Sequence, residues 1–176
     1  MMHVKASNRL YFQLESWIVT RFLQQGPGPC MRLLFRLPIL QYRLGLQTPI
    51  AKQILVLTTT GRKSGKKRQT ALGYGYDPTM NAYSVMTGWG GKSDWYLNAL
   101  KDPRVELWVG KKRFKAIAQR VPLDHAILQM KNLIAINPHA ADMLGKLADK
   151  PYDGTDYWYK EMVDIFPSLY FIPQKT

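Results

Sequence analysis

The spacing of hydrophobic positions changes along the chain, and each change marks a predicted group of elements. From residue 8 to about residue 50, apolar positions recur at helical spacing, interrupted by a glycine–proline run at residues 26–29. Between residues 53 and 121, short β-branched and aromatic runs alternate with turn residues, which is typical of antiparallel strands. Helical spacing returns after Pro122, and the apolar run at residues 167–173 predicts a final strand.

The middle of the chain carries the clearest strand pattern. In the stretch from Arg104 to Gly110, the side chains of Val105, Leu107 and Val109 alternate with polar residues and share one face. Several short strands joined by tight turns, with one inserted helix, predict a mainly β fold of the α+β class, an antiparallel barrel with flanking helices. We expect strands at residues 53–60, 68–76, 81–87, 104–110 and 112–121, and the inserted helix at residues 93–102, capped by Ser93 or Asp94.

The length of 176 residues fits one structural domain, in which residues 1–50 form an N-terminal helical extension and residues 51–176 the cofactor-binding barrel. The chain has no apolar run of membrane-spanning length and no signal-peptide pattern at its start. Cys30 is the single cysteine, which suits a reducing compartment. We therefore expect a cytoplasmic protein.

Charge changes this picture most, because the formal net charge is +13. Such an excess attracts nucleic acid, an anionic membrane or an acidic small molecule. In residues 30–46, Arg32, Arg36 and Arg43 fall on one helical face if the helix continues across Pro38. This segment either lies on the anionic inner face of a membrane or packs on the barrel or a partner.

Part of the charge is concentrated in one hairpin. Five of the seven residues from Arg62 to Arg68 are basic. Gly61 and Gly65 let the backbone turn tightly and approach a ligand, and arginine forks and lysine ammonium groups suit phosphate and carboxylate. The spacing is not that of a P-loop. The stretch is either a phosphate cradle or an ordinary solvated hairpin.

A second motif, at residues 87–100, is a glycine-rich turn that leads into the predicted short helix. Such a turn exposes N–H groups that bind anions, and Trp95, Tyr96 and Asn98 have the chemistry to contact a planar ring. Alternatively, Trp95 and Leu100 form the buried face of the helix. The aromatic cluster at residues 152–159 has the same two interpretations, a planar pocket or a core.

Other chemistries lack support. The histidines are scattered, so we expect no metal site, and no nucleophile elbow or suggestive pair of acids is present. No catalytic side chain is identified from the sequence.

Together, the two motifs resemble the deazaflavin-dependent nitroreductase family, whose members use coenzyme F420. The similarity covers roughly residues 54–121 and implies a split β-barrel like that of FMN-binding proteins. It implies cofactor phosphate and oligoglutamate contacts in the hairpin, and deazaflavin contacts in the second motif. The hairpin residues are Arg62, Lys63, Ser64, Gly65, Lys66, Lys67 and Arg68; the others are Thr87, Gly90, Gly91, Lys92, Trp95 and Asn98.

The chain also departs from the family pattern. Many relatives have a histidine–proline pair where this chain has Ser93 and Asp94, and the C-terminal tyrosines are placed differently, so Tyr157 and Tyr159 are candidate substrate contacts only.

The resemblance implies hydride transfer from reduced coenzyme F420 to a planar electron-poor acceptor, namely a quinone, nitroaromatic or enone. One alternative is an FMN-dependent oxidoreductase on the same barrel. Another is a non-catalytic, peripheral lipid-binding module. Nucleic-acid binding ranks last, because no nucleic-acid motif accompanies the charge. Family analogy keeps a homodimer among the options for the oligomeric state.

Overall fold

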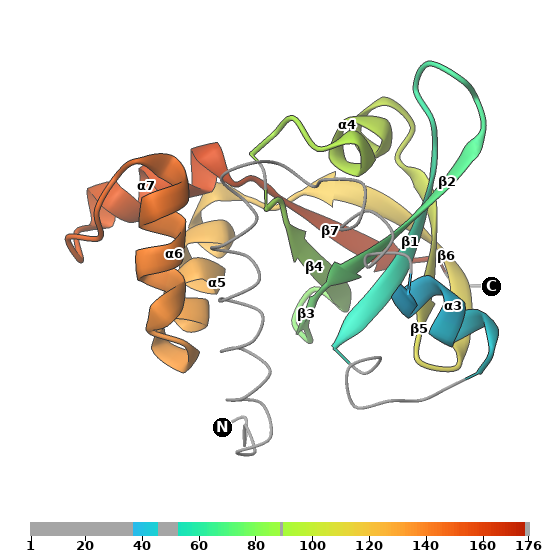
Figure 1. The fold of residues 1–176 in the computed structure, drawn as a ribbon, viewed down its shortest axis with the longest axis horizontal. Coiled ribbons are helices and arrows are strands. Elements are labelled where there is room, and N and C mark those ends of the chain that lie inside the picture. Colours follow the sequence, from blue (N-terminus) through green and yellow to red (C-terminus); the bar gives the residue numbers. More distant parts are fainter. Residues whose placement is uncertain (1–36, 46–52, 89, 175–176) are drawn as a thin grey trace. The chain divides into compact units, whose positions relative to one another are not determined.

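The structure is a computed structural model that describes residues 37–45, 53–88 and 90–174. These residues form two compact units (Figure 1). The barrel unit contains the described residues up to Pro122 and those from Phe166 onward, and the helical unit contains residues 123–165. The predicted boundary between residues 50 and 51 lies outside the described residues, as do Arg32, Arg36 and the predicted helix that starts near residue 8.

A single antiparallel sheet builds the barrel unit, and its strand order is β2-β1-β5-β6-β7-β4-β3. Every predicted strand is present, but the one expected at residues 68–76 is divided at Tyr74 into two strands, β2 and β3. The strands of the sheet are β1 (Ile54–Thr60), β2 (Lys67–Gly73), β3 (Gly75–Asp77), β4 (Ala82–Met86), β5 (Arg104–Val109), β6 (Lys112–Arg120) and β7 (Ser168–Pro173).

One bent run of chain closes this sheet. β2 and β3 lie at opposite edges of the strand order, yet only Tyr74 separates them in sequence. β2 pairs with β1 from Lys67 to Gly73, and β3 pairs with β4 from Gly75 to Asp77. Because the same run of chain hydrogen-bonds at both edges, the sheet curls round on itself (Figure 1). The predicted antiparallel split barrel is confirmed.

The barrel core follows from strand alternation. Leu55 and Leu57 of β1 are fully buried inside with Leu107 of β5 and Phe171 of β7. Val56 points the other way and is also buried, because α3 (Leu37–Arg43) covers that face. This burial on both faces explains why β1 is an uninterrupted apolar run.

Tyr42 attaches α3 to the barrel. Its ring lies 5.3 Å from that of Trp108, and its hydroxyl donates a hydrogen bond to the Ile54 carbonyl and accepts one of 3.2 Å from the Gly110 amide. The opposite face of α3 is apolar but exposed, with Leu37, Leu40 and Leu44 at 48%, 51% and 64% exposure.

The inserted helix α4 (Asp94–Lys101) lies at the end of the barrel unit that carries the β1–β2 turn (Figure 1). Trp95, Tyr96 and Ala99 anchor it in the barrel core. Ser93 occupies the N-cap position, as expected, but its hydroxyl makes no capping bond and lies 3.5 Å from the Gly90 carbonyl oxygen.

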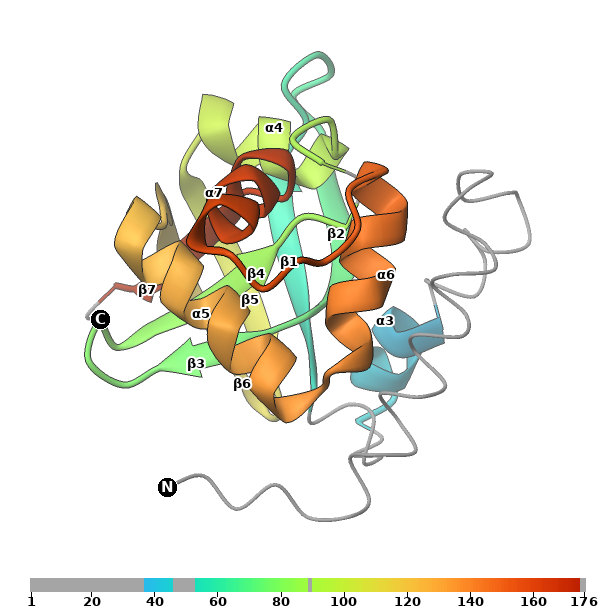
Figure 2. The same cartoon turned by 90° about the vertical axis from the view of Figure 1, so that its left-hand side faces the viewer.

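Among the described residues of the helical unit, three helices are present, and each packs against the other two (Figure 2). They are α5 (Leu123–Ile136), α6 (His139–Ala148) and α7 (Asp156–Ile165). Met130 and Ile134 of α5 are buried, as their spacing predicts. The buried Trp158 of α7 donates to the Lys150 carbonyl at 3.1 Å. Within the residues that the structure describes, no helix has the length and apolar character needed to cross a bilayer.

Asp77 ties the β3–β4 turn to the barrel. Its carboxylate accepts hydrogen bonds from the Thr79 side chain at 2.6 Å and from the Tyr170 hydroxyl at 2.6 Å. These bonds, that of Thr79 foremost, lower the pKa of Asp77 from 3.8 to about 2. A lowered folded-state pKa means stability that is present above the unfolded pKa and is lost as the pH falls toward the folded pKa.

We expect Asp77→Asn to lower the free energy of unfolding at neutral pH by about 0.5–1 kcal/mol, a value reduced for solvent screening. The difference from the wild type should shrink below pH 4 and vanish only below pH 2, because Asp77 is protonated in the folded state only below its pKa of about 2. Urea unfolding at several pH values measures it. Asp142→Asn, at an exposed acid of α6, is the control. A difference that stays constant with pH would contradict the linkage.

Candidate functional site

The basic hairpin, residues 61–68, turns tightly at its tip. The amides of Ser64 and Gly65 donate to the Gly61 carbonyl at 3.2 and 2.8 Å, and the Gly61 amide donates to the Lys66 carbonyl at 2.9 Å. Gly65 has a φ of +66°, which strongly favours glycine. At Gly61 a Cβ would lie 2.7 Å from the Ser64 hydroxyl oxygen. The backbone of the turn therefore favours glycine at position 65, whereas a side chain at position 61 would displace the Ser64 hydroxyl and crowd the Lys66 carbonyl.

Asn98 of α4 holds this hairpin against the barrel end. Its buried side-chain oxygen accepts two hydrogen bonds from Arg62, one from the backbone amide and one from Nη1, both at 3.1 Å. Its amide nitrogen donates to the Thr59 hydroxyl at 3.3 Å. All these bonds link segments far apart in sequence. Asn98 therefore fixes the position of Arg62 relative to α4 and β1.

The guanidinium of Arg62 also forms an ion pair. Nη1 lies 2.7 Å from Asp94 Oδ1, and the side chains are 28% and 84% exposed, respectively. The arginine is thus partly buried while its acid partner is almost fully in solvent.

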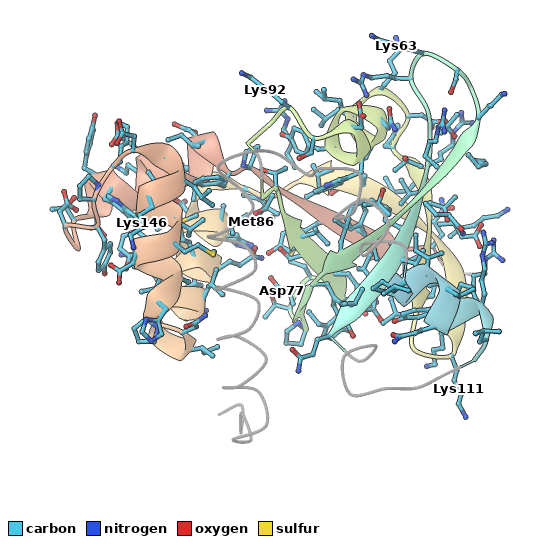
Figure 3. The ribbon with its side chains drawn as sticks, viewed as in Figure 1. Lys63, Asp77, Met86, Lys92, Lys111 and Lys146 are labelled. Atoms are coloured by element: carbon cyan, nitrogen blue, oxygen red, sulfur yellow. The ribbon has the colours of Figure 1, made fainter. Side chains whose placement is uncertain are left out.

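The remaining cations of this end have no acid partner. Within the part of the chain that the structure describes, the side chains of Lys63, Lys66, Arg68 and Lys101 make no hydrogen bond or ion pair. Lys67 alone is engaged, through a 3.0 Å hydrogen bond to Thr60 Oγ1. Figure 3 shows Lys63 projecting from the hairpin tip. An unneutralised group of cations is costly unless solvent or an anion balances it.

A surface depression of about 470 Å³ lies between the hairpin and α4. Its lining combines three cations with two leucines: Arg62, Lys63, Lys101, Leu97 and Leu100. No acidic residue belongs to this lining, so the depression fits the phosphate or carboxylate groups of an anionic ligand, with apolar surface for its carbon chain. Sequence reasoning missed Lys101, although its distance of three residues from Asn98 places both on one side of the helix.

The second predicted motif lies beside α4. Thr87 follows β4, and its amide donates to the Pro167 carbonyl at 3.0 Å. The hydroxyl of Thr87 is fully buried and has no hydrogen-bond partner among the described residues. Buried hydroxyls are normally satisfied, so this one is a candidate ligand contact. Lys92 is exposed near the same barrel end (Figure 3), and Gly90 has a φ of +65°.

Trp95 is only 6% exposed and lies in the barrel core, 6.4 Å from the ring of Phe171. Trp95 therefore anchors the second motif in the core. Its contact with the deazaflavin stays a prediction. In the described residues, no group of histidine, cysteine or acidic side chains is arranged to hold a metal ion.

The candidate substrate tyrosines belong to the helical unit. Tyr157 is 68% exposed, whereas Tyr159 is buried and its hydroxyl lies 2.9 Å from that of Tyr152. Burial, assisted by this hydrogen bond, raises the pKa of Tyr159 to about 12. Lys131 stacks over the Tyr159 ring at 5.2 Å and pairs with Asp156 at 2.6 Å. Tyr159 is therefore a neutral, fixed hydroxyl at physiological pH.

Comparisons with known proteins match this region of the chain. A family model described as F420H(2)-dependent quinone reductase matches residues 40–150. The F420H(2)-dependent quinone reductase Rv1261c of Mycobacterium tuberculosis is 39% identical over 82 residues, or 45% of this chain and 54% of the relative. The chain thus spans about half the length of the curated relatives it matches. A solved F420-H2 dependent reductase, FDR-A, has 22% identity and a TM-score of 0.48, covering 68% of this chain and 94% of its own.

We expect Thr87→Val to raise the free energy of unfolding by about 1 kcal/mol, because it removes an unsatisfied buried hydroxyl while keeping the side-chain volume. The same change should weaken binding of coenzyme F420, if that hydroxyl serves the ligand. Thr59→Val is the matched control, since the Thr59 hydroxyl accepts a bond from Asn98 and its loss should destabilise the fold. Denaturant unfolding and cofactor fluorescence measure the two effects. Unchanged cofactor affinity would remove Thr87 from the site.

Proposed function

Because the chain belongs to the F420H(2)-dependent quinone reductase family, we propose that it is an oxidoreductase that binds coenzyme F420 and reduces a planar, electron-poor acceptor. The family resemblance expected from the two motifs is confirmed, and with it the cofactor class that the family description names. One observation carries the proposal: three cations, Arg62, Lys63 and Lys101, line a depression at the barrel end, and in the described residues no acid pairs with the two lysines.

The chain's own residues have separate tasks in this proposal. The phosphate and oligoglutamate groups of the cofactor are held by the basic hairpin, which includes Arg62 and Lys63, and by Lys101 of α4. Each well-formed, charge-assisted hydrogen bond contributes about 1.5–3 kcal/mol, while exposed pairs contribute about 0–1 kcal/mol. Asn98 keeps Arg62 in place, and the glycine-rich turn at residues 88–91 lets the ring of the cofactor approach the backbone.

When bound, reduced coenzyme F420 supplies a hydride. A quinone that accepts this hydride and one proton becomes a hydroquinone. We favour a quinone over a nitroaromatic or an enone, because the matching family is described by quinone reduction. Tyr157 and Tyr159 remain candidate contacts for that acceptor.

An FMN-dependent oxidoreductase is a weaker alternative. FMN carries one phosphate, whereas the hairpin and α4 offer several cations without acid partners. The oligoglutamate tail of coenzyme F420 uses more of that charge.

The exposed face of α3 favours contact with an anionic membrane. Leu37, Leu40 and Leu44 form an apolar row, and Tyr42 on the other face fixes the helix to the barrel. Tyr42 accepts a hydrogen bond from Gly110, so α3 packs against the turn that carries the exposed cations Lys111 and Lys112. An apolar row beside cations suits the surface of an anionic bilayer, where quinones dissolve. We therefore propose a cytoplasmic enzyme that binds peripherally to the inner face of the membrane through this part of the predicted segment 30–46.

The cofactor proposal is tested by titrating the protein with oxidised coenzyme F420, with FMN in parallel. The tetrapeptide GKKR occurs twice, at residues 65–68 and 110–113, which provides a matched control. We expect a double alanine substitution of Lys66 and Lys67 to weaken F420 binding by about tenfold, and that of Lys111 and Lys112 to change it less than twofold.

Arg62→Ala should weaken binding more, because its guanidinium is the partly buried cation of the depression. Equal losses from the two GKKR pairs would show that only net charge attracts the ligand. If FMN binds tightly and coenzyme F420 does not, the FMN alternative holds.

The membrane proposal predicts flotation with vesicles that contain anionic lipid, and none with purely zwitterionic vesicles. Leu40→Glu and Leu44→Glu should reduce the floated fraction severalfold, because a carboxylate replaces exposed apolar contact. Leu128→Glu in the helical unit is the control, since Leu128 is comparably exposed at 58%. If all three variants float like the wild type, α3 is not the contact surface.

A further inference from the structure

Asp94 is the acid closest to the cations of the depression. Its carboxylate lies 2.7 Å from Arg62 Nη1, yet it remains 84% exposed. A second acid, Asp102, lies at the other end of α4. Its carboxylate is paired with Arg104, whose Nε and Nη2 donate to it at 2.9 and 3.2 Å. Asp102 is therefore fully engaged away from the depression, whereas Asp94 has only Arg62.

Arg62 does not need Asp94 to stay in position. Its backbone amide and Nη1 each donate a hydrogen bond to Asn98 Oδ1, and these two bonds already hold the residue. Asn98 is itself 4% exposed and fixed by its bond to Thr59. The ion pair with Asp94 is an additional contact on a guanidinium that the protein has already placed.

The geometry points to a competing role for Asp94. We propose that its carboxylate is a built-in anion that occupies Arg62 and is displaced when the phosphate or carboxylate of a ligand binds there. This inference rests on the proposed function and concerns the affinity of the same site. An arginine whose face is taken by an exposed carboxylate attracts an incoming anion less than a free one does.

Such a competitor has a consequence for turnover. A hydride-carrying cofactor must leave after oxidation if it is reduced elsewhere, and a site with several unpaired cations would otherwise retain a polyanion. Asp94 returns to Arg62 as the ligand departs, and so lowers the affinity without removing the cation that recognises the ligand.

The test is a double-mutant cycle with Arg62→Ala, Asp94→Asn and the combined variant, read by the fluorescence of oxidised coenzyme F420 at low and high salt. We expect Asp94→Asn to tighten binding by about two- to tenfold at low salt, less at high salt, and not at all when Arg62 is already alanine. Asp102→Asn makes the same change of charge beside Lys67 and is the matched control. Thermal unfolding verifies that each variant is folded.

Three outcomes would overturn the proposal. Weaker binding by Asp94→Asn would make Asp94 a positioning residue for Arg62. Equal tightening by Asp94→Asn and Asp102→Asn would show a general charge effect, and no change would show that Asp94 does not compete.

Tripolyphosphate, titrated by calorimetry in the same variants, separates this inference from the proposed function. If the wild type binds tripolyphosphate but not coenzyme F420, the cofactor proposal fails, and the effect of Asp94→Asn on tripolyphosphate still decides the role of Asp94. If neither anion binds the folded wild type, both proposals fail.

Discussion

The hydrogen-bonded closure of the sheet by residues 67–77 is the constraint on which the rest of the barrel unit depends. β2 pairs with β1 and, one residue later, β3 begins to pair with β4, so the chain must bend sharply at Tyr74. This closure encloses the apolar faces of five further strands. It also brings the start of β2, and therefore the basic hairpin, to the barrel end that α4 covers (Figure 1).

At that end, one buried amide connects the elements that carry the charge. Asn98 joins α4 to Thr59 of β1 and to Arg62 of the hairpin. A buried amide with all its bonds inside the protein is rigid, because breaking any of them leaves an unpaired polar group. This end of the barrel unit thus combines an arginine held by a buried amide with exposed lysines, and the side chains of Lys63 and Lys66 make no hydrogen bond or ion pair within the described residues. This combination suits a ligand with one compact phosphate and a flexible acidic tail.

The two GKKR segments show that composition alone does not make a site. In the second segment, Arg113 is paired with Glu106 and lies over the ring of Trp108, so its charge is already used. In the first, Arg68 has no such partner within the described residues. Both turns use a glycine in the left-handed region, at Gly65 and Gly110. The two hairpins therefore differ in the environment of their cations and not in their sequence.

The sequence by itself determined where strands occur and the class of the fold, but not the division of residues 68–76 into β2 and β3. Period-two alternation, as at Val105 and Leu107, depends only on neighbouring residues. The turns that glycines favour are equally local. The two motifs together also carried the resemblance that implied the cofactor class, whereas their residue types alone left several anionic ligands open. The bounds of α6 and α7 were not predicted, and the aromatic cluster at residues 152–159, which overlaps α7, fitted a pocket as well as a core.

Only the tertiary structure decided which residues meet. Arg62 and Asn98 are 36 positions apart, and nothing in either motif shows that one amide would hold the arginine. Likewise, the sequence allowed two interpretations of Trp95, a contact with a ligand ring or a place in the core. The structure places it in the core, with 6% of its surface exposed. Local patterns set the elements, but contacts between distant residues depend on strand register and on how the sheet closes, which no short stretch of sequence contains.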